Sequence, residues 1–211
     1  MKESTNNPAY YHVHISRGVS KLGANIPSVS LPPVLTCRAD APCTGKCYAR
    51  KGRFSFPHIR DLLASNLAIW NADPVRYKTD VAIAAFHNRF FRWHASGDIP
   101  DAEYLSMMVE LARQLPGTRF LCFTKKFELV NDFILEHGMP PENLRVVFSA
   151  WGDFMPDNPH NLPVAYVRLK NQQTQIPASA FSCPNFCGEC VLGGSSCWDL
   201  KCGQAVCFNE H

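Results

Sequence analysis

Hydrophobic and polar positions alternate along this chain in a way that predicts helices and strands in turn. Apolar residues recur three or four positions apart in four segments, which is the spacing of one helical face. Short apolar runs rich in aromatic and β-branched residues lie between them, as expected for buried strands. The predicted helices run from residue 57 to the Asp73-Pro74 break and over residues 75–88, 101–115 and 127–137. The predicted strands cover residues 89–95, 119–124, 144–150 and 164–169, with further β-rich pieces at 10–15 and 26–31.

Strands that alternate with amphipathic helices indicate parallel βαβ units, so the expected fold class is α/β. An eight-stranded TIM barrel typically needs about 250 residues, and this chain has 211. We therefore expect a partial or small TIM-barrel-like parallel βα layer within a single α/β domain. Its parts would be an N-terminal extended segment with a cysteine loop (1–56), the βα core (57–170) and a cysteine-rich, metal-binding tail (171–211).

Composition argues against several classes of protein. With 46% apolar and 18% charged residues, the chain can bury a core, which a disordered protein cannot do. No apolar run reaches the roughly 18 residues of a membrane helix, and the polar start of the chain does not resemble a secretory signal. The net charge of +3 is too small to indicate nucleic-acid binding by itself. We expect a cytoplasmic protein with no membrane partner.

Cysteine is the residue type that gives the strongest indication of function, because the chain has ten. In a reducing cytosol, clustered thiols bind metals or catalyse reactions more often than they form disulfides. One group lies near the N-terminus and a larger one at the C-terminus. Cys122 stands apart in an apolar run, where we expect a buried structural thiol.

Four cysteines fall within fifteen residues of the tail: Cys183, Cys187, Cys190 and Cys197. Three of them follow one another closely, as in the loops around cubane iron–sulfur clusters. A zinc site normally uses two short pairs separated by a longer loop. We expect a [4Fe-4S] cluster on these four thiols, with zinc as the alternative. The first three also match the three-cysteine loop of radical S-adenosylmethionine enzymes, although that loop follows the first barrel strand and this one follows the last.

The N-terminal group consists of Cys37, Cys43 and Cys47, on a loop ahead of the first helix. Three thiols are an incomplete set, so a second metal site would need a further ligand. The candidates are Cys202, Cys207 and His211. The alternative is three unligated thiols packed in a loop. The basic residues 50–53 that follow are either a solvated turn or a phosphate contact.

Polar residues at the predicted strand ends are candidates for chemistry, because ligands of parallel α/β folds bind beyond the carboxyl ends of strands. His94 and Asp98 could form a proton-transfer pair, and Lys125 could hold an anionic substrate. The structural alternatives are core packing for His94, helix capping for Asp98 and simple solvation for Lys125. The other residues in such positions are Ser96, Thr124, Lys126, Ser149, Trp151, Arg168 and Lys170.

Short motifs spread over almost the whole chain resemble the uncharacterised phage gene product 88 family. They are Ser20-Lys21-Leu22-Gly23, Ser30-Leu31-Pro32, Cys47-Tyr48-Ala49-Arg50-Lys51-Gly52, His94-Ala95-Ser96-Gly97-Asp98, Phe123-Thr124-Lys125, Cys197-Trp198 and the ending Phe208 to His211. The Cys47-Tyr48-Ala49 element is also similar to that of radical-SAM-like phage proteins with an α/β barrel. The resemblance implies a phage or prophage origin, a location in the bacterial host cell and cluster binding. It carries no established reaction.

Three functional hypotheses follow from these observations. The first is an iron–sulfur protein, redox or radical-type, acting on an unknown small molecule or with a redox partner. The second is a zinc-stabilised nucleic-acid-binding module, for which the charge and aromatic content give thin support. The third is a cluster or zinc ion that only stabilises the fold. We favour the first.

Overall fold

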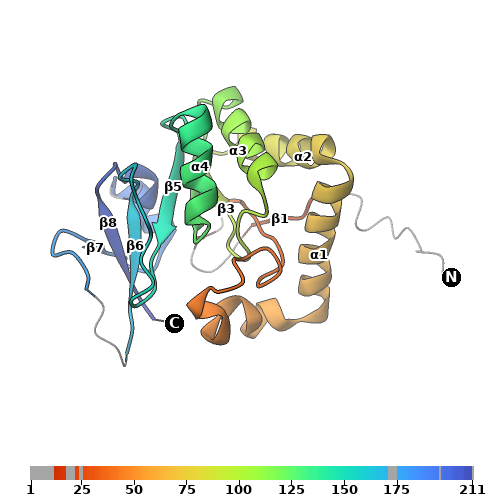
Figure 1. Cartoon of the computed structure of the whole chain (residues 1–211). Coiled ribbons are helices and arrows are strands. Elements are labelled where there is room, and N and C mark those ends of the chain that lie inside the picture. Colours follow the sequence, from red (N-terminus) through yellow and green to blue (C-terminus); the bar gives the residue numbers. More distant parts are fainter. Residues whose placement is uncertain (1–11, 18–21, 24–25, 171–174, 195, 211) are drawn as a thin grey trace.

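A single eight-stranded sheet organises the protein. The computed structural model describes residues 12–17, 22–23, 26–170, 175–194 and 196–210. The strands lie in the order β1-β2-β3-β4-β5-β6-β8-β7 (Figure 1), and neighbours are parallel except for the antiparallel pair β1 and β2. Their bounds are β1 Ile15–Ser16, β2 Ser28–Val29, β3 Phe90–Trp93, β4 Arg119–Thr124, β5 Leu144–Ser149, β6 Val164–Arg168, β7 Phe181–Ser182 and β8 Ala205–Asn209.

Four longer helices precede or connect the central strands: α1 Pro57–Ala72, α2 Pro74–Phe86, α3 Ala102–Gln114 and α4 Phe127–His137. Their ends follow local chemistry. α1 and α2 begin with proline, whose missing N–H is not needed in the first turn. The Asp101 carboxylate caps α3 by accepting a hydrogen bond from the Tyr104 amide at 2.8 Å. Gly138, at a φ of 79°, ends α4.

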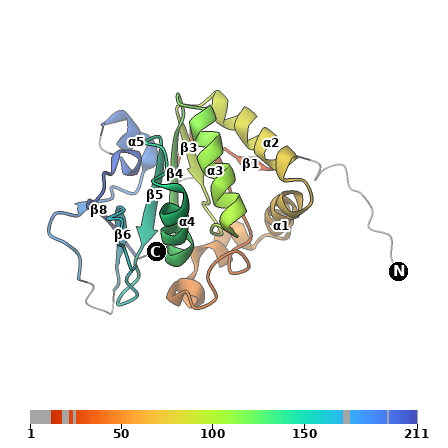
Figure 2. The ribbon, with the colours of Figure 1, turned by 45° about the horizontal axis from the view of Figure 1, so that its top comes forward.

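The two faces of the sheet are covered differently (Figure 2). The helices α1 to α4 pack against one face, to which the strands contribute alternate residues such as Phe91, Phe120 and Val146. The intervening residues, including Leu121 and Val147, face the opposite side and pack against the C-terminal tail. In a doubly wound fold this second face would carry helices as well. Here the cysteine-rich tail takes their place.

The tail is fastened to that second face by specific contacts. It contains the short helix α5 (Cys187–Leu192) and the 3₁₀ helix η5 (Cys197–Asp199). Trp198 of η5 is buried, and its indole N–H donates to the Phe91 carbonyl at 3.2 Å. Arg119 of β4 forms an ion pair with Asp199 and donates to the Trp198 carbonyl at 3.0 Å. These contacts tie residues 197–199 to the middle of the sheet.

The structure confirms the α/β class, while the barrel-like form is not confirmed. The sheet is open in the described parts of the chain, because β1 and β7 lie at opposite edges of the strand order. The predicted elements between residues 57 and 170 are all present, with ends shifted by one or two residues. The tail holds two strands that the sequence pattern did not predict, and β8 is inserted between β6 and β7. Part of the predicted strand at 10–15 lies outside the described residues.

None of the helices in the described residues combines the length and the apolar character that a membrane crossing requires.

Candidate functional site

The carboxyl ends of the parallel strands β2 to β5 form one edge of the sheet, here called the carboxyl edge. Three loops with candidate residues leave from it. Residues 94–101 follow β3, Lys125 and Lys126 follow β4, and the N-terminal cysteine loop (residues 30–47) follows β2. The structure therefore brings the first cysteine group to the place where the sequence predicted ligand-binding residues.

Hydrogen bonds hold the N-terminal cysteine loop on the loop after β3. The Leu31 amide donates to the Ser96 carbonyl at 2.9 Å. The Asp98 amide donates to the Thr36 hydroxyl at 3.0 Å. Tyr48 closes the far end, because its hydroxyl donates to the Ala95 carbonyl at 2.5 Å. The loop is thus attached at several points along its length.

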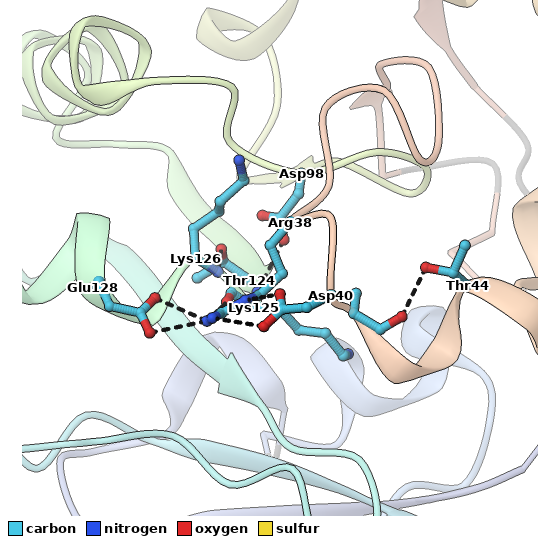
Figure 3. A network of polar contacts seen from close by, with 9 residues as sticks. Arg38, Asp40, Thr44, Asp98, Thr124, Lys125, Lys126 and Glu128 are labelled. Atoms are coloured by element: carbon cyan, nitrogen blue, oxygen red, sulfur yellow. Dashed lines mark hydrogen bonds and ion pairs between the residues drawn. The ribbon is translucent and has the colours of Figure 1, made fainter.

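A second attachment joins the N-terminal cysteine loop to the end of β4 (Figure 3). Arg38 donates to the Lys125 carbonyl at 3.3 Å and forms ion pairs with Asp40 and with Glu128 of α4. The neighbouring residue, Cys37, is half-buried. Arg38 therefore sets the position of this thiol relative to β4.

The three N-terminal thiols share one electrostatic environment with Asp98 and Lys125. Burial raises the pKa of Cys37 to about 11, a backbone hydrogen bond from Val34 opposes the rise, and the charges of Asp98, Cys47 and Cys43 add to it. Burial also raises the pKa of Cys43, whereas the charge of Lys125 lowers it. A thiolate raises the pKa of a neighbouring thiol, so thiols that lie together do not readily ionise together by themselves. A cation bound among them favours the loss of their protons.

Asp98 and Lys125 are both fixed at the carboxyl edge. The buried Asp98 carboxylate accepts hydrogen bonds from the amides of Lys125 at 2.9 Å and Ile99 at 2.8 Å. Burial nevertheless raises its pKa. The Lys125 ammonium donates to the Ser149 hydroxyl at 2.7 Å and lies 5.9 Å from the centre of the Trp151 ring. The structure thus assembles three of the predicted strand-end candidates around Lys125.

His94 lies apart from that group, in the core on the helix side of the sheet. Its Nε2 is 3.1 Å from the Tyr104 hydroxyl and its Nδ1 is 3.8 Å from the Cys122 sulfur. Burial, assisted by the charge of Arg92, lowers the pKa of His94 to about 3. Among the described contacts, no hydrogen bond joins His94 to Asp98. The geometry matches the structural alternative for His94, and Cys122 is buried as the sequence predicted.

The four predicted tail ligands gather on the opposite face of the sheet. Cys183 and Cys197 are buried in one apolar cluster, and Cys187 packs against it. Burial and the charges of Cys183, Cys187 and Cys190 raise the pKa of Cys197 to about 12, whereas Arg92 lowers it. Three thiols of this short segment are therefore close enough to Cys197 to influence the pKa of the fourth.

One of these sulfurs accepts a hydrogen bond from the backbone of the tail. Asn185 has a φ of 73°, in the left-handed region, and its amide donates to the Cys183 sulfur at 3.4 Å. Amide donors of this kind surround the sulfurs of many metal centres. In the parts of the chain that the structure describes, however, no three His, Cys, Asp or Glu side chains stand at the spacing of a metal shell.

Two of the remaining candidates for the second metal site, Cys202 and Cys207, lie in the tail. Cys202 is exposed, and its charge acts on Arg145 of β5. Cys207 is buried in β8, where its carbonyl accepts a hydrogen bond from the Cys183 amide at 2.8 Å. His211 lies outside the described residues. All ten cysteines are present as thiols.

Comparison with known proteins agrees with the resemblance noted in the sequence. The sequence model of the family described as Gene product 88 matches residues 4–189. The chain belongs to this family of phage gene products. The matched region includes the whole N-terminal cysteine loop, Asp98 and Lys125, and it ends between Cys187 and Cys190. Neither the curated proteins nor the solved structures compared with this Gene product 88 protein contain a match.

Proposed function

We propose that this Gene product 88 protein binds a [4Fe-4S] cluster through Cys183, Cys187, Cys190 and Cys197. One observation carries the proposal. Cys183 and Cys197, at the two ends of the tail segment, are buried in the same apolar cluster with Cys187 packed against it. Neighbouring buried thiols lose their protons only at a high free-energy cost when no cation is present. An iron centre would lower that cost, because it binds the thiolates as ligands.

Two features favour iron–sulfur over zinc. The close succession of Cys183, Cys187 and Cys190 is typical of cubane clusters rather than of paired zinc knuckles. The Asn185 amide already donates to a ligand sulfur, and such bonds stabilise the reduced, more negative state of a cluster. Loading would require the four thiols to turn toward one another, since they are not at coordination spacing in the described structure.

The cluster would serve a redox or radical-type reaction at the carboxyl edge. Cys37, Cys43 and Cys47 would contribute thiols there, and Asp98 and Lys125 would hold a small substrate. Arg92 of β3 affects both regions, because its positive charge acts to lower the pKa of Cys197 in the tail and of Tyr48 beside the N-terminal cysteine loop.

Two alternatives each rest on one observation. A purely structural cluster is favoured by the way the tail replaces helices on one face of the sheet. A zinc-stabilised nucleic-acid-binding module is favoured by residues 41–60, which contain five lysines and arginines and no acidic residue. Both alternatives keep the tail cysteines as ligands and differ from our proposal in the metal or in its role.

Metal analysis of protein purified without oxygen tests the proposal. We expect brown protein with broad absorption at about 400 nm and with bound iron and sulfide. Cys190→Ser should abolish the colour. Cys202→Ser, which removes an exposed thiol from the same tail, should retain it. Zinc without iron, or colour that survives Cys190→Ser, would contradict the proposed centre.

A second measurement separates a reactive cluster from a structural one. Removing the iron from a purely structural centre should unfold the tail and lower the melting temperature without any reversible redox signal. A cluster that serves a reaction should instead be reduced and reoxidised reversibly while the protein stays folded. Gel shifts with DNA or RNA that weaken as salt rises would favour the nucleic-acid alternative.

A further inference from the structure

A cleft of about 500 Å³ lies beside the N-terminal cysteine loop, between that loop and α1. Its wall includes Pro33, Val34, Phe54 and the buried Leu63, with Arg50 and Arg60 at the rim. Cavities of this size hold single small molecules. The edge-on contact between Tyr48 and Phe54, with 6.1 Å between ring centres, helps to hold the aromatic wall in place.

The charge around the cleft is positive and uncompensated. Lys46 forms an ion pair with Glu210 at 2.7 Å. The other four cations of residues 41–60 are Arg50, Lys51, Arg53 and Arg60. Among the described residues, no carboxylate lies within ion-pair distance of any of these four. A concave surface with two arginines and no acid attracts anions.

Backbone strain marks the same place. Val34 has a φ of 70°, and a β-branched residue rarely adopts this left-handed conformation. Strain of this kind is retained where the surrounding structure imposes it, often at ligand sites. Val34 lines the cleft and also provides a backbone hydrogen bond to the Cys37 thiol. A molecule in the cleft would therefore lie next to the N-terminal thiols.

We propose that this cleft binds a small phosphate-bearing molecule, with its phosphate at Arg50 and Arg60 and its apolar part against Phe54 and Leu63. Arginine matches phosphate because its planar guanidinium donates two parallel hydrogen bonds. Two guanidinium groups balance the double charge of a phosphate monoester, whereas a carboxylate would need only one. The site is independent of the tail cluster, so it goes beyond the function proposed above.

Calorimetric titration of the full chain with AMP, which combines a phosphate with an aromatic base, tests this site. We expect AMP to bind and adenosine to bind at least tenfold more weakly, because only AMP carries the phosphate. Arg60→Ala should weaken AMP binding at least about tenfold, because it removes a guanidinium that donates charge-assisted hydrogen bonds to the phosphate. Arg113→Ala, which removes an exposed arginine from α3, should leave AMP affinity unchanged.

Three results would overturn the proposal. One is equal affinity for AMP and adenosine, and another is unchanged AMP binding in both Arg50→Ala and Arg60→Ala. The third is a single-stranded oligonucleotide that binds while AMP and inorganic phosphate at millimolar concentration do not compete, which would assign the basic surface to a nucleic acid. Both arginines are exposed, so these variants should fold. The titration uses no metal signal, and its outcome is therefore distinct from that of the cluster experiments.

Discussion

The backbone amide of Lys125 donates a 2.9 Å hydrogen bond to the carboxylate of Asp98. This bond joins the loop after β3 to the end of β4. The second carboxylate oxygen accepts from the Ile99 amide at 2.8 Å, and a hydrogen bond from the Thr124 side chain also lowers the pKa of Asp98 against the larger effect of burial. Since the Asp98 amide in turn donates to Thr36, one residue links two strand ends and the N-terminal cysteine loop.

Asp98→Ala should destabilise the protein by about 3 kcal/mol, because it leaves buried amide donors without an acceptor. Asp98→Asn should cost less, since its carbonyl oxygen can still accept one of these bonds. Urea denaturation gives the free energies of unfolding for both variants. Asp132→Ala, at an exposed site on α4, should change the stability by less than about 0.5 kcal/mol. If Asp98→Ala were as harmless as this control, the linking role would be refuted.

His94 should make the folded protein sensitive to acid. Burial, followed by the charge of Arg92, lowers its pKa to about 3 in the folded protein, from 6.5 as the ordinary value. The unfolded chain therefore binds a proton more readily than the folded one. The stabilising contribution is complete above pH 6.5 and is lost as the pH falls toward 3, by about 1.4 kcal/mol per pH unit.

His94→Gln should remove that contribution. At pH 7 the variant should be less stable than the wild type, because it loses the contact with Tyr104. As the pH falls from 6.5 to 4, the gap in unfolding free energy should close. Leu135→Gln, which alters an exposed residue of α4 and removes no titratable group, should keep a constant gap. A gap that stayed constant for His94→Gln would mean that His94 is not held neutral by the fold.

The sequence pattern predicts the βα core well because its signals are local. Helix periodicity and the Asp73-Pro74 break both act within one or two turns, and the predicted helices match α1 to α4 closely. The sequence pattern does not predict β8, because its apolar residues lie among the tail cysteines, whose spacing indicates metal ligands instead of a strand. Its place between β6 and β7 depends on long-range pairing that no local pattern encodes.

The candidate site was predictable as a list of residues but not as an arrangement. Parallel strands imply that their carboxyl ends meet, so Asp98, Lys125 and Ser149 could be expected near one another. The left-handed backbone of His94, at a φ of 55°, is not evident from sequence, and the His94 ring lies in the core with Tyr104. The approach of the N-terminal thiols to Asp98 depends on loop contacts such as that of Arg38, which sequence spacing does not reveal.

Arg92 should tune the proposed tail cluster. Its guanidinium carbon lies 4.2 Å from the centre of the Phe123 ring, and Phe123 packs against the apolar cluster that contains Cys197. A positive charge near a cluster favours the reduced, more negative state. Arg92→Met should therefore lower the reduction potential by some tens of millivolts. Electrochemical titration of the loaded protein measures this shift.

Arg145→Met is the matched control, because Arg145 lies on β5, two strands away from Arg92 in the same sheet, and its charge interacts with Cys202. Its potential should stay close to that of the wild type. Equal shifts in both variants would show that only net charge matters. A shift to higher potential in Arg92→Met would contradict the predicted effect of Arg92.

Gly97 should be essential for the packing of the N-terminal cysteine loop against the loop that follows β3. Its φ is 80°, and an added Cβ would lie 2.7 Å from the Leu31 carbonyl oxygen and 2.7 Å from the Thr36 hydroxyl. Gly97→Ala would therefore combine backbone strain with a clash, and we expect a loss of about 2–4 kcal/mol in the free energy of unfolding. Gly117→Ala should cost less than about 1 kcal/mol, since a Cβ there would meet nothing within 4 Å.

The same variant tests whether the loop position protects the thiols. Cys37, Cys43 and Cys47 are half-buried while the loop lies on the carboxyl edge. If Gly97→Ala pushes the loop away, these thiols become more exposed, and the burial that raises the pKa of Cys37 and Cys43 is reduced. Their reaction with a thiol reagent at pH 8 should therefore be faster than in the wild type. An unchanged rate in a measurably destabilised Gly97→Ala protein would show that the close approach at Gly97 does not position the cysteines.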